Sequence, residues 1–308
     1  MIKVVDLRKG AGSDICENLL ARRGSEPEDV TEKVKEIVEE VRKHGDKALL
    51  EYTGRFDGVY LKEWQLKVSE EEIELAYENT ESRLIEVIRR AKKNIENYHL
   101  RQKENSWFCT EEDGILLGQI ARPLKTVGIY VPGGTAPLPS SVLMNAVPAK
   151  VAGVERIIMA TPPGKDGKVN PYVLVAAYEA GVDDIYKAGG AQAIAAMAFG
   201  TETIPRVDKI TGPGNIYVAA AKRMVYGFCD IDMIAGPSEI MVVADETANA
   251  KFVAADLLSQ AEHDVMASSI LVTTSERIAE HVREEIEKQV RSLKRKDIIE
   301  SSINSYGI

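Results

Sequence analysis

Four short stretches rich in glycine and proline are the clearest places where this chain could hold a ligand. They span residues 130–134, 189–192, 212–215 and 236–239, and each contains a side chain that donates or accepts hydrogen bonds. Glycine lets a ligand approach the backbone closely, and a helix that follows offers free N–H groups to anionic atoms. One such turn is more often a plain tight connection, but four of them favour a binding site.

A nucleotide is only weakly indicated by pattern alone. The segment that begins at Gly212 starts like the dinucleotide fingerprint G-x-G-x-x-G, but Tyr217 stands where the third glycine belongs. Because the third glycine serves close packing of the helix on the sheet, its absence weakens the match. The spacing therefore leaves the ligand of these turns open.

A second kind of chemistry is suggested by Gln260 and His263. They lie three residues apart near the end of an expected helix, so we expect them on one helical face. An oxygen and an imidazole can occupy two corners of a metal site. A histidine at a helix C-terminus more often interacts with the helix dipole. Spacing alone leaves both interpretations open.

The elements that position these residues alternate between strand and helix after residue 126. We expect strands at 127–131, 156–160, 184–188, 209–211, 239–244 and 269–274, with helices at 140–152, 171–180, 192–199, 216–226, 249–263 and 275–295. This alternation predicts an α/β protein whose parallel sheet binds ligands at the carboxyl ends of its strands. The earlier part is mainly helical, with capping boxes at Ser25 and Ser69 and a helix end at Gly45, and we expect it to be scaffold.

Composition narrows the class of protein. The 308 residues carry a net charge of −9, which argues against a broad nucleic-acid-binding face. The three cysteines are widely spaced and predict reduced thiols in a reducing compartment. The chain has neither an apolar run that would span a membrane nor a signal peptide at its start. We therefore expect a cytoplasmic protein that acts on a small molecule, without nucleic-acid or membrane partners.

Two longer motifs point to a family. The run Ile-Asp-Met-Ile-Ala-Gly-Pro-Ser-Glu at 231–239, followed by Leu-Leu-Ser-Gln-Ala-Glu-His at 257–263, closely resembles the signature of the histidinol dehydrogenases. The resemblance implies an NAD- and zinc-dependent oxidation of L-histidinol to L-histidine through an aldehyde. It implies that NAD contacts Tyr130, Gln192 and Asn215. It also implies that the substrate contacts Ser238, Gln260 and His263, the last two of which would bind zinc.

The resemblance also sets expectations for architecture. It implies two incomplete Rossmann-like parallel-sheet domains with an N-terminal helical extension, and a homodimer. We expect an arm at 1–25, a first α/β domain from 26–129 with 236–308, and an NAD-binding domain at 130–235. Ser140 and Ser141 fall near the substrate in the family pattern, but the same residues also suit a helix N-cap, and both interpretations stay open.

The family's catalytic Glu-His pair, within a Pro-Glu-His-Leu motif, has no counterpart in this sequence. The same holds for its two further zinc ligands, an aspartate and a histidine. We expect these residues beyond Ile308, so the 308-residue polypeptide would be shortened and inactive by itself. Two alternatives remain: a related dehydrogenase of another alcohol, or a non-catalytic NAD-binding fragment. Retained NAD binding without turnover or stoichiometric zinc would favour the fragment.

Overall fold

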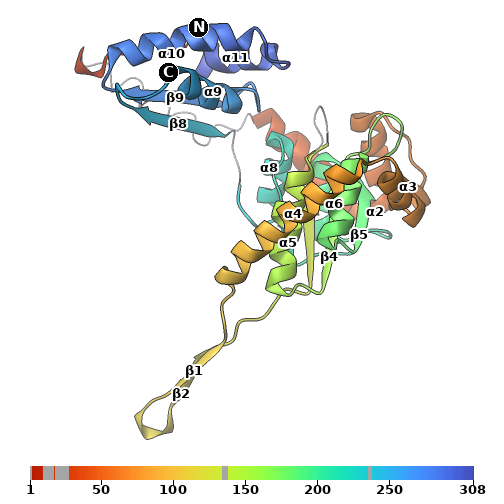
Figure 1. The fold of residues 1–308 in the computed structure, drawn as a ribbon. Helices are drawn as coiled ribbons and strands as arrows, with labels where there is room; N and C mark the ends of the chain where they lie inside the picture. The colour runs from red at the N-terminus through yellow and green to blue at the C-terminus, as the bar shows by residue number, and fades with distance from the viewer. Residues whose placement is uncertain (1, 10–16, 18–27, 134–137, 235–237) are drawn as a thin grey trace. The chain divides into compact units, whose positions relative to one another are not determined.

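A computed structural model describes residues 2–9, 17, 28–133, 138–234 and 238–308. The chain forms two compact units, of which the larger is Glu26–Ile234 and the smaller combines Met1–Ser25 with Ala235–Ile308. Figure 1 shows the elements of both units.

The larger unit is built on a five-stranded sheet with the strand order β5-β4-β3-β6-β7. Every neighbouring pair is parallel. The order places β3 between β4 and β6, so the chain moves outward in one direction to β5 and then returns to the other side of β3. Ligands bind where the strand order reverses in this way. The strands are β3 (Thr126–Tyr130), β4 (Arg156–Thr161), β5 (Asp184–Lys187), β6 (Lys209–Thr211) and β7 (Asp230–Ile231).

Helices cover both faces of this sheet. Alternate residues of a strand point to opposite faces, so Ile157 and Met159 enter one core while Ile158 and Ala160 enter the other. One core lies under α3 (Glu70–Glu78), α4 (Ser82–His99), α5 (Pro139–Ala152) and α6 (Pro171–Ala180). The other lies under α2 (Glu28–Asp57), α7 (Gly190–Phe199) and α8 (Ile216–Val225).

Helix α2 is two helices joined at a kink. Gly45 has φ 52° and ψ −132°, a conformation outside the helical region that glycine adopts readily. The predicted helix end at Gly45 is therefore confirmed, but a second helical segment continues to Asp57. This second segment brings its C-terminal end to the carboxyl edge of the sheet, where it contributes to the cavity described below.

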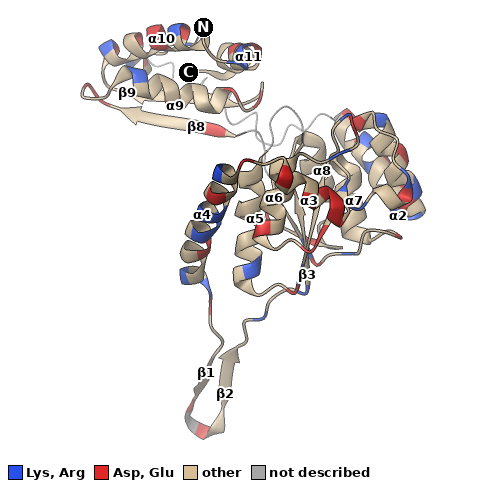
Figure 2. Cartoon of the chain, turned by 45° about the vertical axis from the view of Figure 1, so that its right-hand side comes forward, with Lys and Arg blue, Asp and Glu red and all other residues tan. Residues whose placement is uncertain are grey.

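A β-hairpin interrupts the run from α4 to the sheet. Its antiparallel strands are β1 (Trp107–Thr110) and β2 (Leu116–Gln119), and it projects from the larger unit in Figures 1 and 2. Asp113 and Gly114 in the turn have φ of 68° and 80°. Two consecutive residues with positive φ turn the chain with the twist that hairpins need. The hairpin was not among the predicted elements.

The smaller unit has a parallel pair, β8 (Glu239–Ala244) and β9 (Ser268–Thr273). Helix α9 (Ala250–Ala261) connects them and packs with α10 (Glu276–Val290) and α11 (Lys296–Tyr306). Their buried apolar residues form one core, which also includes Ile2 near the start of the chain. The Lys3 N–H donates to the Gly307 carbonyl at 3.1 Å, which joins the two ends of this unit.

The predicted α/β class with a parallel sheet is confirmed, and the predicted strands match β3, β4, β5, β6, β8 and β9 within one residue at each end. The capping box at Ser69 is present, whereas the one predicted at Ser25 lies outside the described residues. One grouping differs from the prediction. Residues 26–129 lie in the same compact unit as the five-stranded sheet, not with 236–308, because α2 packs on α7 and α8 while α4 packs on α5 and α6.

Candidate cofactor site

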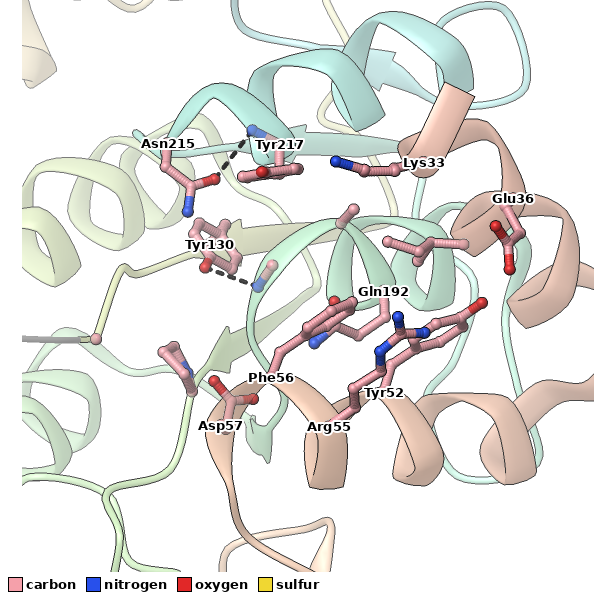
Figure 3. A pocket seen from close by; sticks show the side chains of 15 residues that line it. Lys33, Glu36, Tyr52, Arg55, Phe56, Asp57, Tyr130, Gln192, Asn215 and Tyr217 are labelled. Carbon is pink, nitrogen blue, oxygen red and sulfur yellow. Dashed lines mark hydrogen bonds between the residues drawn. The ribbon is translucent and has the colours of Figure 1, made fainter. Parts of the chain in front are cut away.

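A cavity of about 580 Å³ opens at the carboxyl edge of the five-stranded sheet, shown in Figure 3. Its wall comes from the turns after β3, β4, β5 and β6 and from one side of α2. The three predicted NAD contacts therefore lie around one space, although they come from different turns. The lining residues are Lys33, Glu36, Ile37, Tyr52, Arg55, Phe56, Asp57, Tyr130, Gly133, Pro162, Gly190, Ala191, Gln192, Asn215 and Tyr217.

Tyr130 ends β3 and is almost fully buried, with 4% of its surface exposed. Its hydroxyl accepts a hydrogen bond from the Gly190 N–H at 3.0 Å. This bond ties the end of β3 to the start of α7, so two sides of the cavity are held at a fixed separation. Burial raises the pKa of Tyr130 to about 12, and the phenol is therefore neutral at physiological pH.

Gln192 lies in the first turn of α7 and is 2% exposed. Its Oε1 atom is buried and has no hydrogen-bond partner among the described residues. A buried amide oxygen without a partner costs free energy, and native structures usually satisfy such atoms. Because Gln192 lines the cavity, a bound ligand that donates a hydrogen bond would satisfy it.

Asn215 is the N-cap of α8. Its Oδ1 accepts hydrogen bonds from the Tyr217 and Val218 N–H groups, both at 3.1 Å. These bonds satisfy two amides that the helix itself leaves free. Its amide nitrogen points towards Tyr130 in Figure 3. The side chain is thus oriented by the helix and presents a hydrogen-bond donor to the cavity.

An ion pair between a buried lysine and an accessible aspartate supports the turn before Asn215. Lys222 is 2% exposed, pairs with Asp232 and donates to the Gly212 carbonyl at 3.0 Å. Asp232 in turn accepts from the Gly212 N–H at 2.9 Å. Both backbone groups of Gly212 are therefore bonded to one charge pair. No signal in the sequence marks Lys222 as buried, because a lysine in the last turn of a helix ordinarily faces solvent.

Gly212 itself occupies a position that excludes other residues. Its φ is 121°, and a Cβ atom there would lie 2.1 Å from the Tyr130 carbonyl oxygen. The turn after β6 thus passes directly against the end of β3. This close approach brings Asn215 and Tyr130 to the same cavity.

Helix α2 forms the wall opposite the turns, which corrects the expectation that the N-terminal helices are only scaffold. The Tyr52 and Phe56 rings are stacked, with centroids 5.6 Å apart, and Phe56 is 52% exposed. The Asp57 Oδ2 atom is buried and, like Gln192 Oε1, has no partner among the described residues. Burial raises the pKa of Asp57 to about 6. Lys33 and Arg55 add two basic groups to the same wall.

The predicted substrate and zinc residues all belong to the smaller unit. Ser238 directly precedes β8, and Gln260 lies in the last turn of α9. The expected helix to residue 263 is too long: α9 ends at Ala261, Glu262 is its C-cap, and His263 follows. The His263 N–H donates to the Gln260 carbonyl at 3.1 Å, so the two residues remain neighbours in a tight turn. His263 is exposed and Gln260 is half-buried.

These two side chains supply fewer donors than a zinc site requires. Structural and catalytic zinc sites have three or four protein ligands. Within the described ranges, no group of three or more His, Cys, Asp or Glu residues is placed to hold a metal ion. The described residues therefore do not provide a complete zinc site.

Ser140 and Ser141 are not N-cap residues. Helix α5 begins at Pro139 and its N-cap is Leu138, so both serines lie within the first turn. The N-cap alternative is therefore wrong, because Pro139 fits the first helical position and places the cap at Leu138, two residues before Ser140. Their predicted closeness to substrate stays a prediction.

The sheet order and the cavity define an α/β protein with an open cavity at the point where the strand order of its parallel sheet reverses, which is where ligands bind in such folds. In the part of the chain that the structure describes, no helix combines the length and apolar character needed to cross a membrane.

Comparison with known proteins identifies the family. The family model described as histidinol dehydrogenase matches residues 20–308. Histidinol dehydrogenases of Clostridium acetobutylicum and Caldanaerobacter subterraneus are each 57% identical over 307 residues, covering 100% of this chain and 71% of the relative. The crystal structure of histidinol dehydrogenase from Elizabethkingia anophelis matches with a TM-score of 0.87 and 46% identity, covering 93% of this chain and 66% of that one.

The chain belongs to the histidinol dehydrogenase family, whose members are NAD-dependent oxidoreductases. It spans about 71% of the length of these two relatives.

Proposed function

We propose that this chain belongs to an enzyme of histidine biosynthesis that carries out the NAD-linked, four-electron oxidation of L-histidinol to L-histidine by way of the aldehyde. The 308 residues contain no counterpart of the Pro-Glu-His-Leu motif, so we expect them to bind NAD but to be inactive by themselves. The larger unit would hold NAD in the cavity at the sheet edge. The observation that carries the proposal is the convergence of Tyr130, Gln192 and Asn215 on one cavity, together with membership of the family.

The cavity has the features that a dinucleotide needs. Its volume of about 580 Å³ falls in the range of small-molecule sites. Helices α7 and α8 both begin at its edge, and helix N-termini favour the negative charge of a pyrophosphate. Gln192 Oε1 and Asp57 Oδ2 are acceptors without described partners, which suits the hydroxyl groups of a ribose. The exposed face of Phe56 offers a surface for a planar ring.

These groups suggest separate roles for the cofactor and for the protein. NAD, when bound, accepts the hydride. The protein's own residues bind and orient it: Asn215 donates, Gln192 and Asp57 accept, and Tyr130 fixes the spacing between the end of β3 and the start of α7.

The substrate side is assigned to the smaller unit. Ser238, Gln260 and His263 would contact L-histidinol, and the last two would donate to zinc. The described residues do not complete a zinc site by themselves. We further propose a cytoplasmic homodimer.

Calorimetric titration of the chain with NAD tests the proposal. We expect one NAD per chain, with Gln192→Leu weakening binding at least tenfold. The same substitution should leave the free energy of unfolding equal or higher, because it removes a buried oxygen that has no partner. A chain that does not bind NAD, or Gln192→Leu with the affinity of the unaltered chain, would overturn the assignment of this cavity.

A further inference from the structure

Asp57, at the end of α2, has one carboxylate oxygen that no described residue uses. Its Oδ2 atom is buried and has no hydrogen-bond partner among the described residues. Because Asp57 lines the cavity, this oxygen is available to a ligand there. An ionised carboxylate only accepts hydrogen bonds, so the group that it binds must be a hydroxyl or an N–H.

The carboxylate lies close to the predicted NAD contacts. Burial is the main cause of the raised pKa of Tyr130, and the negative charge of Asp57 adds to it, which requires the two side chains to be near one another. Figure 3 shows Asp57 and Phe56 on the part of α2 that borders the same cavity as Tyr130. Phe56 is 52% exposed. An aromatic face next to a carboxylate suits a planar base and the ribose attached to it.

The acid that ordinarily binds the ribose in parallel-sheet dinucleotide sites is already occupied in this chain. In such sites an Asp or Glu about 20 residues after the glycine turn accepts a hydrogen bond from the ribose 2′-hydroxyl. Asp232 has this position, because it follows β7 and lies 20 residues after Gly212. Its Oδ2 accepts from the Gly212 N–H, and its Oδ1 accepts from Lys222 and from the Met233 N–H. Both oxygens therefore hold the turn, and a ribose in the cavity needs another acid.

The two ends of NAD have different requirements. The nicotinamide must meet the substrate, and the residues proposed to hold the substrate belong to the smaller unit. Asp57 and Phe56 belong to the larger unit, so we assign the adenosine end to them. The adenosine ribose is also the part that distinguishes NAD from NADP, which carries a phosphate on the 2′-oxygen of this ribose.

We infer that Asp57 binds the 2′-hydroxyl of the adenosine ribose and thereby makes the site select NAD over NADP. This inference rests on the NAD site proposed above. The hydroxyl donates its proton to Oδ2 and satisfies the buried oxygen. The phosphate of NADP carries about two negative charges at neutral pH, so it meets a like charge in a partly buried site.

Calorimetric titrations with NAD and with NADP test this role. The unaltered chain should bind NAD at least ~100-fold more tightly than NADP, because like charges brought together in a binding site are strongly unfavourable. Asp57→Asn removes the charge but keeps an acceptor of the same shape, so it should bind NAD roughly 3–10-fold more weakly. It should bind NADP at least ~10-fold more tightly, because Lys33 and Arg55 on the same wall then attract the phosphate without the opposing carboxylate. Asp57→Ser, which also makes room for the phosphate, should show the same change of preference.

Two control variants separate selection by Asp57 from other effects. Gln192→Leu removes the other buried cavity oxygen that has no described partner, but it removes no charge. It should therefore weaken NAD and NADP alike and leave the ratio of their affinities unchanged. Glu51→Gln removes a negative charge from an exposed position of α2 outside the described lining of the cavity. It should change neither affinity by more than about threefold, because charges in solvent are screened.

Titration with ADP identifies which ribose Asp57 binds. ADP contains the adenosine ribose but lacks the nicotinamide ribose, so Asp57→Asn should weaken the binding of ADP by the same factor as that of NAD. If Asp57→Asn weakens NAD but not ADP, Asp57 contacts the nicotinamide ribose and the inference is wrong.

Two other results would overturn the inference: an unaltered chain that binds NADP as tightly as NAD, or an Asp57→Asn variant with the affinities of the unaltered chain. If NAD binds in those cases and Gln192→Leu weakens it, the proposed function stands and only the role of Asp57 is wrong. If the unaltered chain binds neither dinucleotide, the proposed cofactor site fails and the role of Asp57 fails with it.

Discussion

Asn215 has two roles that one pair of substitutions can separate. Its Oδ1 accepts two N–H groups at the start of α8, and its amide nitrogen faces the cavity. Alanine removes both functions. Aspartate keeps the acceptor that caps the helix, but it replaces the donor with a negative charge beside the proposed pyrophosphate.

The expected magnitudes differ for the two properties. Loss of an N-cap side chain costs about 1 kcal/mol, so Asn215→Ala should lower the free energy of unfolding by that amount. Asn215→Asp should keep it or raise it by up to ~1 kcal/mol, because a negative charge stabilises a helix N-terminus. Loss of a hydrogen bond to a charged group costs about 1.5–3 kcal/mol, so NAD should bind roughly 10–100-fold more weakly to either variant. Aspartate should be the weaker binder because it adds repulsion.

Urea unfolding measures the first property and calorimetric titration with NAD measures the second. Asn249→Ala is a matched control, since Asn249 caps α9 in the smaller unit through the Lys251 N–H at 3.0 Å. It should lose similar stability without losing NAD affinity. The reasoning about the cap fails if Asn215→Asp is as unstable as Asn215→Ala. The reasoning about the donor fails if Asn215→Asp binds NAD as well as the unaltered chain.

Three further substitutions test the surroundings of the cavity, each by urea unfolding without NAD. Burial raises the pKa of Asp57 from 3.8 to about 6, so ionisation of Asp57 opposes folding increasingly as pH rises from about 4 to 6. The Asp57→Asn variant should therefore be more stable than the unaltered chain by roughly 1–3 kcal/mol at neutral pH, a range that allows for the partial exposure of Asp57. The difference in stability should vanish below pH 4. An equal gain in stability at neutral pH and below pH 4 would contradict this. Lys222→Met should lower stability by roughly 1–3 kcal/mol, because it leaves the buried Gly212 carbonyl without its donor and the accessible Asp232 carboxylate without its counter-ion. A loss under ~1 kcal/mol would refute it. Gly212→Ala should cost more than Gly227→Ala, because both have positive φ but only Gly212 would place a Cβ 2.1 Å from the Tyr130 oxygen; equal losses would show that the close approach relaxes freely.

Local sequence signals were sufficient to predict the strands and most helices of the sheet. Short apolar strand runs such as β4, where five consecutive residues are buried, apolar helices and glycine at helix ends are all signals that act within a few residues, and these elements lie where they were expected. The turns at strand ends could be placed at one edge because parallel strands share their carboxyl side. That argument places the turns at 130–134, 189–192 and 212–215 at one edge, and the family resemblance singles out Tyr130, Gln192 and Asn215 within them.

The arrangement of the N-terminal helices could not be predicted in the same way. Whether α2 packs on α7 or elsewhere depends on contacts between residues far apart in sequence, which periodicity does not report. The wall formed by Tyr52, Phe56 and Asp57 was missed for this reason. One local signal was present. The segment Arg-Phe-Asp-Gly at 55–58 ends in a glycine, which is typical of a helix end, and so indicates a second helix after the one that ends at Gly45. The hairpin also had its signal, since Asp113-Gly114 lies between two β-prone runs.

The cavity is largely preorganised. Tyr130 already bonds the Gly190 N–H, and Asn215 already caps α8. Gly212 is held through both of its backbone groups by the Lys222–Asp232 pair. Folding therefore fixes these positions, and a ligand would not have to order them. Among the described residues that line the cavity, only Gln192 and Asp57 keep buried oxygen atoms without a hydrogen-bond partner. Because a bound NAD would satisfy those two atoms without rearranging the others, its binding free energy should depend more steeply on Gln192 than the stability of the fold does.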